Sequence, residues 1–222
     1  MRNQVTKSRK FAEICNLGFM PNGAHADQRR ERVYGPIHDE LTCILATLDA
    51  NATTGQLHDA YERIKREHIR DMIPRDVRSK IVQLYEDILP QYEKELVTLQ
   101  VDYRNRMIEE IASGIPVIVA GNGTKSSPRN INEVVVLAGS AYWLIEGWIP
   151  SSMERELEDA FERVKARNKN MQDESFLWFF EEWKCRLHKG KEYPAFLTLR
   201  HQAISLIQEI DKEIISDLES EF

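Results

Sequence analysis

The chain has 222 residues, of which 42% are hydrophobic and 30% are charged, with a net charge of −6. The length allows one large domain or two small ones, and the steady recurrence of aromatic and branched residues argues against general disorder. The negative balance disfavours a broad surface for duplex DNA. Three widely spaced cysteines without a CxxC pair give no zinc knuckle and favour a reducing, cytoplasmic compartment.

Residues 1–35 are predicted to form an N-terminal arm with one short helix, because Phe11, Ile14 and Cys15 form an apolar stripe. The end of the arm, from Asn22 to Pro36, is expected to be a polar and basic connection. The arm is either a solvated terminus, since no aromatic side chains are interleaved with its first basic residues, or a nucleic-acid contact. The second interpretation would use Arg2, Lys7, Arg9, Lys10, Arg29, Arg30 and Arg32.

The first helical half is predicted over residues 36–112, where apolar residues recur every three or four positions. One helix ends at the DANATTG turn, and the next is capped by Thr53 or Thr54. Pro90 kinks or restarts a third helix, which then continues to the end of this half. The stripe of the third helix is Val77, Ile81, Leu84 and Ile88.

Residues 113–130 differ from their surroundings, because they contain three glycines, two prolines and no acidic residue. We expect a connection between two halves. The run PVIVAG could form a short strand, but a lone strand has no evident partner. AGNGTKSS is similar to a phosphate-binding loop, yet Thr124 replaces the glycine before Lys125, and Pro128 follows too soon for a helix to open. A glycine-rich loop is therefore predicted.

The second helical half is predicted over residues 131–222. Its first helix ends near Trp148 and contains an uncharged run of 12 residues, whereas a membrane span needs roughly 20. Ser175 is expected to cap the aromatic helix FLWFFEEWKCRL. Nothing in the chain requires a β-sheet. The sequence therefore predicts an all-α bundle of about seven or eight helices that makes no membrane contact.

A short sequence occurs twice: LHDAYERIK at residues 57–65 and LEDAFERVK at residues 157–165, with six of the nine positions identical. Each copy follows an apolar helix and precedes a helix with the same apolar spacing. The match is either a coincidence of two similar helices or a duplication. In the second case the bundle consists of two related three-helix units.

The charged residues shared by the two copies fall outside the apolar stripe on a helical wheel. In each copy an aspartate and an arginine lie four positions apart, which allows an ion pair. A solvated face and a surface used twice on one protein partner are the two interpretations. The residues are Asp59, Glu62 and Arg63 in the first copy, and Asp159, Glu162 and Arg163 in the second.

The run RIKREH, Arg63 to His68, contains the spacing R-x4-H and resembles the active-site motif of HEPN-type ribonucleases, which are small α-helical proteins. The resemblance covers six of the 222 residues. It implies proton transfer by His68 and phosphate binding by Arg63. The family usually carries a polar residue where this chain has Ile64. The wheel also places Arg63 about 140° from His68, so the site would require a dimer. A histidine at the boundary of the core is the competing interpretation.

Two apolar residues of the aromatic helix, Leu177 and Trp178, lie off its main stripe. Such a tryptophan is either covered by another helix of the same chain or left for a partner, and tryptophan is enriched among residues that anchor interfaces. The main stripe of this helix is Phe176, Phe179, Phe180 and Trp183.

No metal-ligand set, nucleophile motif or cofactor site is predicted. His58, Glu62, Glu158 and Glu162 could be brought together in a bundle, but they flank the apolar stripe and lack the E-x-x-H spacing of carboxylate-bridged sites. The sequence therefore predicts a non-enzymatic interaction protein: an adaptor, regulator or inhibitor that binds another protein through helix faces and the Trp178 region. The alternatives are a homodimeric HEPN-like ribonuclease and a nucleic-acid binder that uses the arm.

Overall fold

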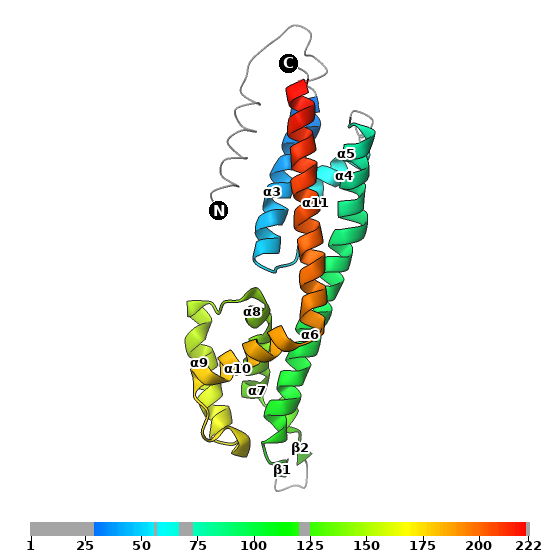
Figure 1. Cartoon of the computed structure of the whole chain (residues 1–222). Coiled ribbons are helices and arrows are strands. Elements are labelled where there is room, and N and C mark those ends of the chain that lie inside the picture. Colours follow the sequence, from blue (N-terminus) through cyan, green and yellow to red (C-terminus); the bar gives the residue numbers. More distant parts are fainter. Residues whose placement is uncertain (1–28, 56, 67–72, 120–124, 221–222) are drawn as a thin grey trace. The chain divides into compact units, whose positions relative to one another are not determined.

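The computed structural model describes residues 29–55, 57–66, 73–119 and 125–220, and its elements carry the labels of Figure 1. Their contacts define two compact units. Among the described residues, the first unit consists of residues 29–49, 53–55, 57–66, 73–93 and 198–220, and the second consists of residues 50–52, 94–119 and 125–197. The long helices α6 and α11 contribute residues to both, and each unit is described by itself.

The described part of the chain is α-helical apart from one small hairpin. The helices are α3 (Gly35–Asp49), α4 (Asp59–Arg66), α5 (Arg75–Val82), α6 (Leu89–Ser113), α7 (Asn132–Gly139), α8 (Ala141–Glu146), α9 (Ser151–Lys165), α10 (Phe176–Lys189) and α11 (Glu192–Ser220). Since α5 runs into α6 through a π-helical segment, and one residue separates α7 from α8, these residues form seven helical runs. The prediction of an all-α bundle is confirmed. None of these helices combines the length and the apolar character that a membrane crossing requires.

In the first unit α3 and α11 lie side by side (Figure 1). The α3 residues at helical spacing, Ile37, Leu41, Ile44 and Leu48, are completely buried. Two polar pairs link this region to α11. His38 Nδ1 lies 3.2 Å from Asp211 Oδ1, and the Tyr34 hydroxyl donates a hydrogen bond to Asp217. Paired polar groups therefore join α11 both to α3 and to the π-helical segment Arg30–Tyr34 that precedes it.

The expected polar connection before α3 becomes helical sooner than the sequence indicated. A π-helical segment, Arg30–Tyr34, leads directly into α3, and its residues Val33 and Tyr34 are completely buried. Burial of these two side chains favours a helical start here. The basic residues around them gave the segment its polar character in the sequence, and the prediction of a connection followed from that character.

The amino terminus of α4 is capped by a residue from another helix. The carboxylate of Glu40 on α3 accepts hydrogen bonds from the backbone N–H groups of Ala60, at 2.6 Å, and Tyr61, at 3.4 Å. The same carboxylate accepts a hydrogen bond from the Tyr85 hydroxyl at 2.7 Å. The expected cap at Thr53 or Thr54 is therefore wrong, since Thr54 Oγ1 instead donates to Glu93 at 2.6 Å.

Pro90, which was expected to kink or restart the third helix, lies where the helical run changes from π-helix to α-helix. It lies in the first turn of α6, directly after the π-helical segment Gln83–Ile88. Proline lacks an N–H donor, so the wider turn before it can accommodate the missing hydrogen bond and the bulk of the ring. The segment also contributes two buried side chains, Leu84 and Tyr85, and Tyr85 stacks on Tyr61 with ring centroids 4.4 Å apart.

The second unit packs α7, α8, α9 and α10 around a hydrophobic core (Figure 1). The helix predicted to run to Trp148 is interrupted: α7 ends at Gly139, and α8 begins at Ala141. The Ser140 hydroxyl donates to the Leu137 carbonyl at this break. Such local bonds compete with the helical ladder. Gly147, with a φ of 86°, ends α8 in the left-handed conformation that glycine accepts most easily.

The carboxyl end of α6 is fixed to the loop after α9 by one buried asparagine. Asn168 is 1% exposed, and its Nδ2 donates to the Ile111 carbonyl at 2.7 Å. Its Oδ1 accepts from the backbone N–H of Asn170 at 2.9 Å, and the backbone N–H of Lys169 donates to the Gly114 carbonyl at 3.1 Å. Gly114 leaves the space that the Asn168 amide occupies.

The connection at residues 113–130 contains two very short strands. β1 (Ile118–Val119) pairs with β2 (Lys125–Ser126) in antiparallel register, so the expectation that a strand here would lack a partner is wrong. The partner is local and polar, which is why apolar patterning did not reveal it. Residues 120–124, the tip that is similar to a phosphate loop, lie outside the described residues. The division of the chain into halves at this connection stays a prediction.

The two copies of the repeated sequence share one further contact. Lys65 Nζ lies 5.2 Å from the centroid of the Tyr61 ring, and Lys165 Nζ lies 5.8 Å from the centroid of the Phe161 ring. A lysine four positions after an aromatic residue covers that ring in both helices, which gives the repeated lysine a local role. The helices themselves differ in length, with 8 residues in α4 and 15 in α9. Duplication stays a prediction.

Candidate functional site: the amino-terminal face of α10

The start of α10 is set by a local cap. The Ser175 hydroxyl accepts a hydrogen bond from the backbone N–H of Trp178 at 3.2 Å, as the sequence predicted. From this start the apolar stripe turns inward. Phe179, Phe180 and Trp183 are buried, and Trp183 meets Tyr103 of α6 edge to face with ring centroids 5.6 Å apart. The cap and the buried stripe together fix the rotation of α10.

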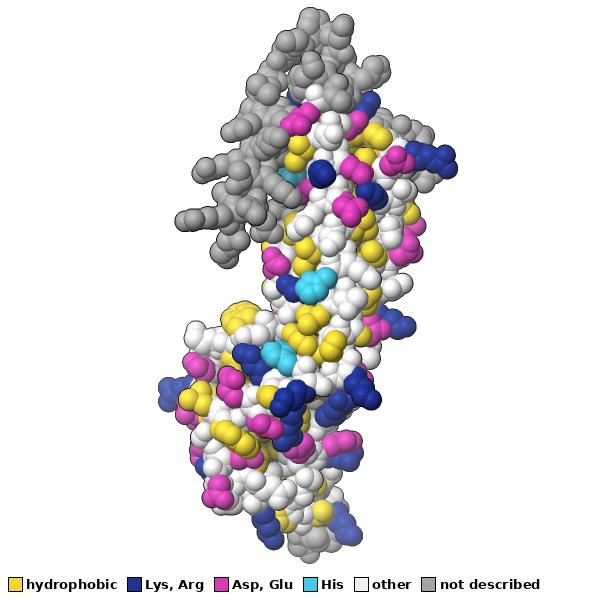
Figure 2. Space-filling model, viewed as in Figure 1, with side chains coloured by type: hydrophobic (Ala, Val, Ile, Leu, Met, Phe, Trp, Pro, Cys, Tyr) yellow, Lys and Arg dark blue, Asp and Glu magenta, His cyan; other side chains and the backbone are white. Residues whose placement is uncertain are grey.

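That rotation directs two neighbouring apolar residues outward. Leu177 is 73% exposed and Trp178 is 52% exposed. About half of Trp178 is therefore accessible, and its role in binding a partner stays a prediction. Figure 2 shows hydrophobic side chains among charged ones on the surface of the α9 and α10 region. Leu177 and Trp178 are neighbours in the chain, so together they form a small exposed apolar surface at the start of α10.

A hollow with a volume of about 70 Å³ lies beside Trp178. Its walls come from α6, from the loop after α9 and from α10. The residues that determine its chemistry are Glu110, Glu174, Trp178, Glu182, Trp183 and Arg186. Three carboxylates therefore face one guanidinium beside an exposed indole.

The only cation among these six residues is already bound. Arg186 Nη1 lies 2.5 Å from Glu110 Oε1, and its Nε lies 2.9 Å from Glu182 Oε1. Its guanidinium carbon also lies 5.1 Å from the centroid of the Trp183 ring. These contacts raise the pKa of Arg186 further above its ordinary value, since both carboxylates accept hydrogen bonds from it. The guanidinium is therefore held in place on the wall of the hollow.

The carboxylate of Glu174, unlike those of Glu110 and Glu182, forms no ion pair with Arg186. Lys165 Nζ donates to its backbone carbonyl at 2.6 Å. Within the part of the chain that the structure describes, no hydrogen bond or ion pair reaches its carboxylate. Partial burial raises the pKa of Glu174, and the charges of Glu110 and Glu182 act in the same direction, against the opposing charges of Arg186 and Lys165. The carboxylate is thus available to a cation from outside the chain.

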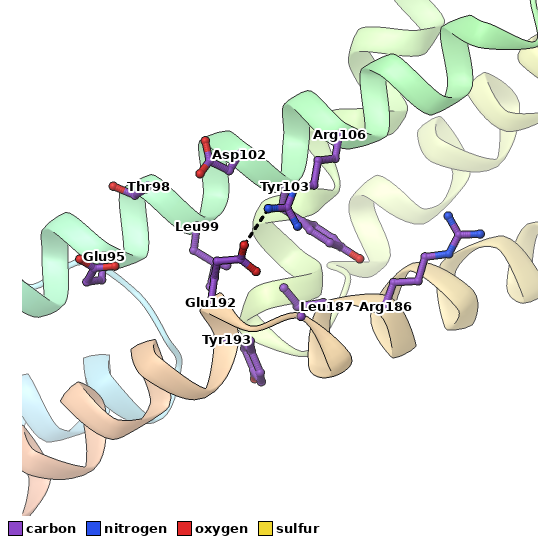
Figure 3. A pocket seen from close by; sticks show the side chains of 11 residues that line it. Glu95, Thr98, Leu99, Asp102, Tyr103, Arg106, Arg186, Leu187, Glu192 and Tyr193 are labelled. Atoms are coloured by element: carbon purple, nitrogen blue, oxygen red, sulfur yellow. Dashed lines mark hydrogen bonds and ion pairs between the residues drawn. The ribbon is translucent and has the colours of Figure 1, made fainter.

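A second hollow, of about 50 Å³, lies between α6 and the junction of α10 with α11 (Figure 3). The Arg106 guanidinium on α6 reaches across it to Glu192 at 2.9 Å, which holds the pKa of that carboxyl below its usual value. Tyr103 points toward the backbone, where its hydroxyl donates to the Trp183 carbonyl. Arg106 and Glu192 therefore bind each other across this hollow, whose other charged lining residues are Glu95, Asp102 and Arg186.

The charged residues of the repeated sequence lie at the surface, as the wheel indicated. Asp59, Arg63, Asp159, Glu162 and Arg163 are exposed, and Glu62 is partly exposed. Their contacts differ between the copies. Arg163 lies 3.9 Å from Glu133 of α7, whereas Arg63 Nη2 donates to the Arg32 carbonyl at 2.7 Å. Their role in binding a partner stays a prediction.

The residues proposed for nucleic-acid chemistry are described only in part. His68 lies outside the described residues, as do Arg2, Lys7, Arg9 and Lys10, so the R-x4-H site and the basic arm stay predictions. Arg29 forms an ion pair with Asp217 at 3.0 Å, Arg30 is buried, and Arg32 is exposed. Of these three arginines, Arg32 therefore has the side chain most accessible to a phosphate.

One polar cluster was missed by the sequence analysis. His38, Glu40 and Tyr85 of the first unit lie close to Asp211 of α11, through the contacts given above. Burial raises the pKa of Tyr85, and the nearby Glu40 carboxylate raises it further. Nothing in the spacing of these residues could have brought together positions up to 173 residues apart. No group of three or more histidine, cysteine, aspartate or glutamate residues suited to a metal ion occurs among the described residues.

Comparison with known proteins found no protein-family model, no curated protein and no solved structure that matches the chain.

Proposed function

We propose that this chain is a non-enzymatic interaction protein and that Leu177 and Trp178 form its main contact surface. The observation that carries the proposal is the exposure of these two residues, at 73% and 52%, on a helix whose residues Phe179, Phe180 and Trp183 are buried in the core. Anchor residues of interfaces are enriched in tryptophan and lie beside pockets that a partner can fill or complete. The hollow beside Trp178 provides such a site.

The rigidity of the surface supports the same proposal. Ser175 fixes the first turn of α10, and the buried residues Phe179 and Trp183 fix its rotation. A binding residue held by its scaffold loses little conformational freedom when a partner docks. The backbone that carries Leu177 and Trp178 is therefore preorganised for binding.

Photo-crosslinking tests the proposal with a matched control in the same unit. Trp148 is 57% exposed, close to the exposure of Trp178, but does not line the hollow. We expect a photoreactive phenylalanine at position 178 to yield discrete crosslinked species in cells that express the chain. The same residue at position 148 should not yield these species.

Competition makes the crosslinking specific. Purified wild-type chain should abolish the crosslinks from position 178, and purified Trp178→Ala chain should leave them in place. Identical crosslinks from positions 178 and 148, or equal competition by the two purified chains, would contradict the proposal.

A further inference from the structure

Two surfaces of different chemistry meet at the start of α10. One is the apolar pair Leu177 and Trp178, and the other is the acidic hollow that Trp178 borders. A partner that covers the apolar pair must also cover the mouth of the hollow. The chemistry of the hollow therefore restricts which partner can dock.

The charges in the hollow favour a cation. Glu110, Glu174 and Glu182 outnumber Arg186, so these groups carry two negative charges in excess. The excess negative charge would repel an acidic side chain of a partner. Arg186 would attract such a side chain only weakly, because its guanidinium already forms ion pairs with two of the glutamates. A cation would find the Glu174 carboxylate available and the Trp178 indole beside it, and both groups attract positive charge.

The size of the hollow favours one side chain. Sites for cofactors and other small molecules usually have volumes of about 300 Å³ or more. The volume here is about 70 Å³, which is suited to the end of a lysine or arginine side chain. The exposed Leu177 and Trp178 then remain to contact apolar residues next to that cation in the partner.

We propose that the surface at Leu177 and Trp178 binds a protein segment in which a lysine or arginine adjoins an apolar residue. The cation enters the hollow beside Glu174 and Trp178, and the apolar neighbour covers Leu177. This inference rests on the proposed function and specifies the chemistry of the partner.

Peptide selection tests the inference without a known partner. A random peptide library displayed on phage is selected on the purified full-length chain, after counter-selection on the Trp178→Ala chain. We expect the peptides that require Trp178 to be enriched in lysine or arginine next to aliphatic or aromatic residues. Peptides that require Trp178 but show no such enrichment would overturn the inference and leave the interaction surface intact. If no selected peptide requires Trp178, the proposed function is overturned as well.

A charge exchange gives the second measurement. In the strongest selected peptide, changing the basic residue to glutamate should weaken binding about tenfold or more. Glu174→Lys in the protein should lower the affinity for the original peptide to a similar extent. The same substitution should restore binding of the peptide that carries glutamate in place of its basic residue. Glu158→Lys, at an exposed position on α9, is the control and should change neither affinity. Equal effects of the two protein substitutions would overturn a role for the hollow.

Discussion

The contact between Gly114 and Asn168 allows a stability prediction to be worked from distances. A Cβ atom added at Gly114 would lie 1.8 Å, 2.6 Å and 2.9 Å from the Oδ1, Cγ and Nδ2 atoms of Asn168. The asparagine amide cannot move away freely, because it is buried and bonded to Ile111 and Asn170. Gly114→Ala must therefore break these two hydrogen bonds. Each buried polar group left without a partner costs about 1–3 kcal/mol, so the two lost bonds of Asn168 should together cost about 2–6 kcal/mol.

Urea unfolding followed by tryptophan fluorescence is the appropriate assay. The four tryptophans of the chain, Trp143, Trp148, Trp178 and Trp183, all belong to the second unit, which also contains Gly114. The expected loss corresponds to a decrease of about 1–3 M in the urea midpoint for a typical slope of about 2 kcal/mol per M.

Gly139→Ala is the matched control, because a Cβ there would meet nothing within 4 Å. Alanine is the better helix former at such a position, so the control should be neutral or stabilising by up to about 1 kcal/mol.

A double-mutant cycle tests the cause of the loss. In the Asn168→Ala background the obstructing amide is absent, so Gly114→Ala should cost almost nothing further. If Gly114→Ala costs as much in that background as in the wild type, the steric explanation is refuted. A change below about 0.5 kcal/mol in the wild-type background would refute it equally, since that is the ordinary range for substitutions without a structural cause.

Three other predictions concern buried and capping groups. Asp211→Ala should destabilise the first unit by about 1–3 kcal/mol, because it removes a buried hydrogen-bond partner of His38. Glu209→Ala, at an exposed position on α11, is the control and should change the thermal circular dichroism transition little. Partial burial raises the pKa of Glu146 above its ordinary 4.5, so the folded state binds that proton more tightly and loses stability as the pH rises through this region. Glu146→Gln should therefore match the wild type near pH 4 and exceed its stability at pH 7, and urea midpoints that differ equally at both pH values would contradict the sign. Ser175→Ala should cost about 0.5–2 kcal/mol by fluorescence-monitored unfolding, while Ser175→Asp should retain most of the stability because aspartate is also a good cap.

The sequence was most informative where one helix determines its own surroundings. Three of the four residues of the predicted stripe of α10, Phe179, Phe180 and Trp183, are buried, and the fourth, Phe176, is partly buried. The same wheel placed Leu177 and Trp178 off that stripe, and both are exposed. Helical periodicity is a local property, so it reports which side of a helix is apolar without any knowledge of the neighbouring helices.

Features that depend on distant residues could not be read in the same way. Glu40 caps α4 from another helix, and nothing in the sequence of α4 indicates that partner. The hollow beside Trp178 is lined by Glu110 together with Glu174 and Glu182. Glu110 lies far from the other two along the chain, so the sequence gives no sign that the three residues form a cluster. Tertiary packing determines these contacts, and the spacing of residues along one helix carries no information about them.

The π-helical segment Gln83–Ile88 also limits how the length of this region can change. Its hydrogen bonds span five residues where those of an α-helix span four, so each turn of it holds additional chain. Deleting one residue here would allow a regular α-helix but would rotate one flank of the helical run relative to the other by about 100°. Tyr85 would then leave Glu40, or the buried Leu89 and Tyr92 would turn toward the surface. Among proteins descended from a common ancestor with this chain, we therefore expect the number of residues between Val77 and Leu96 to vary less than the residues themselves.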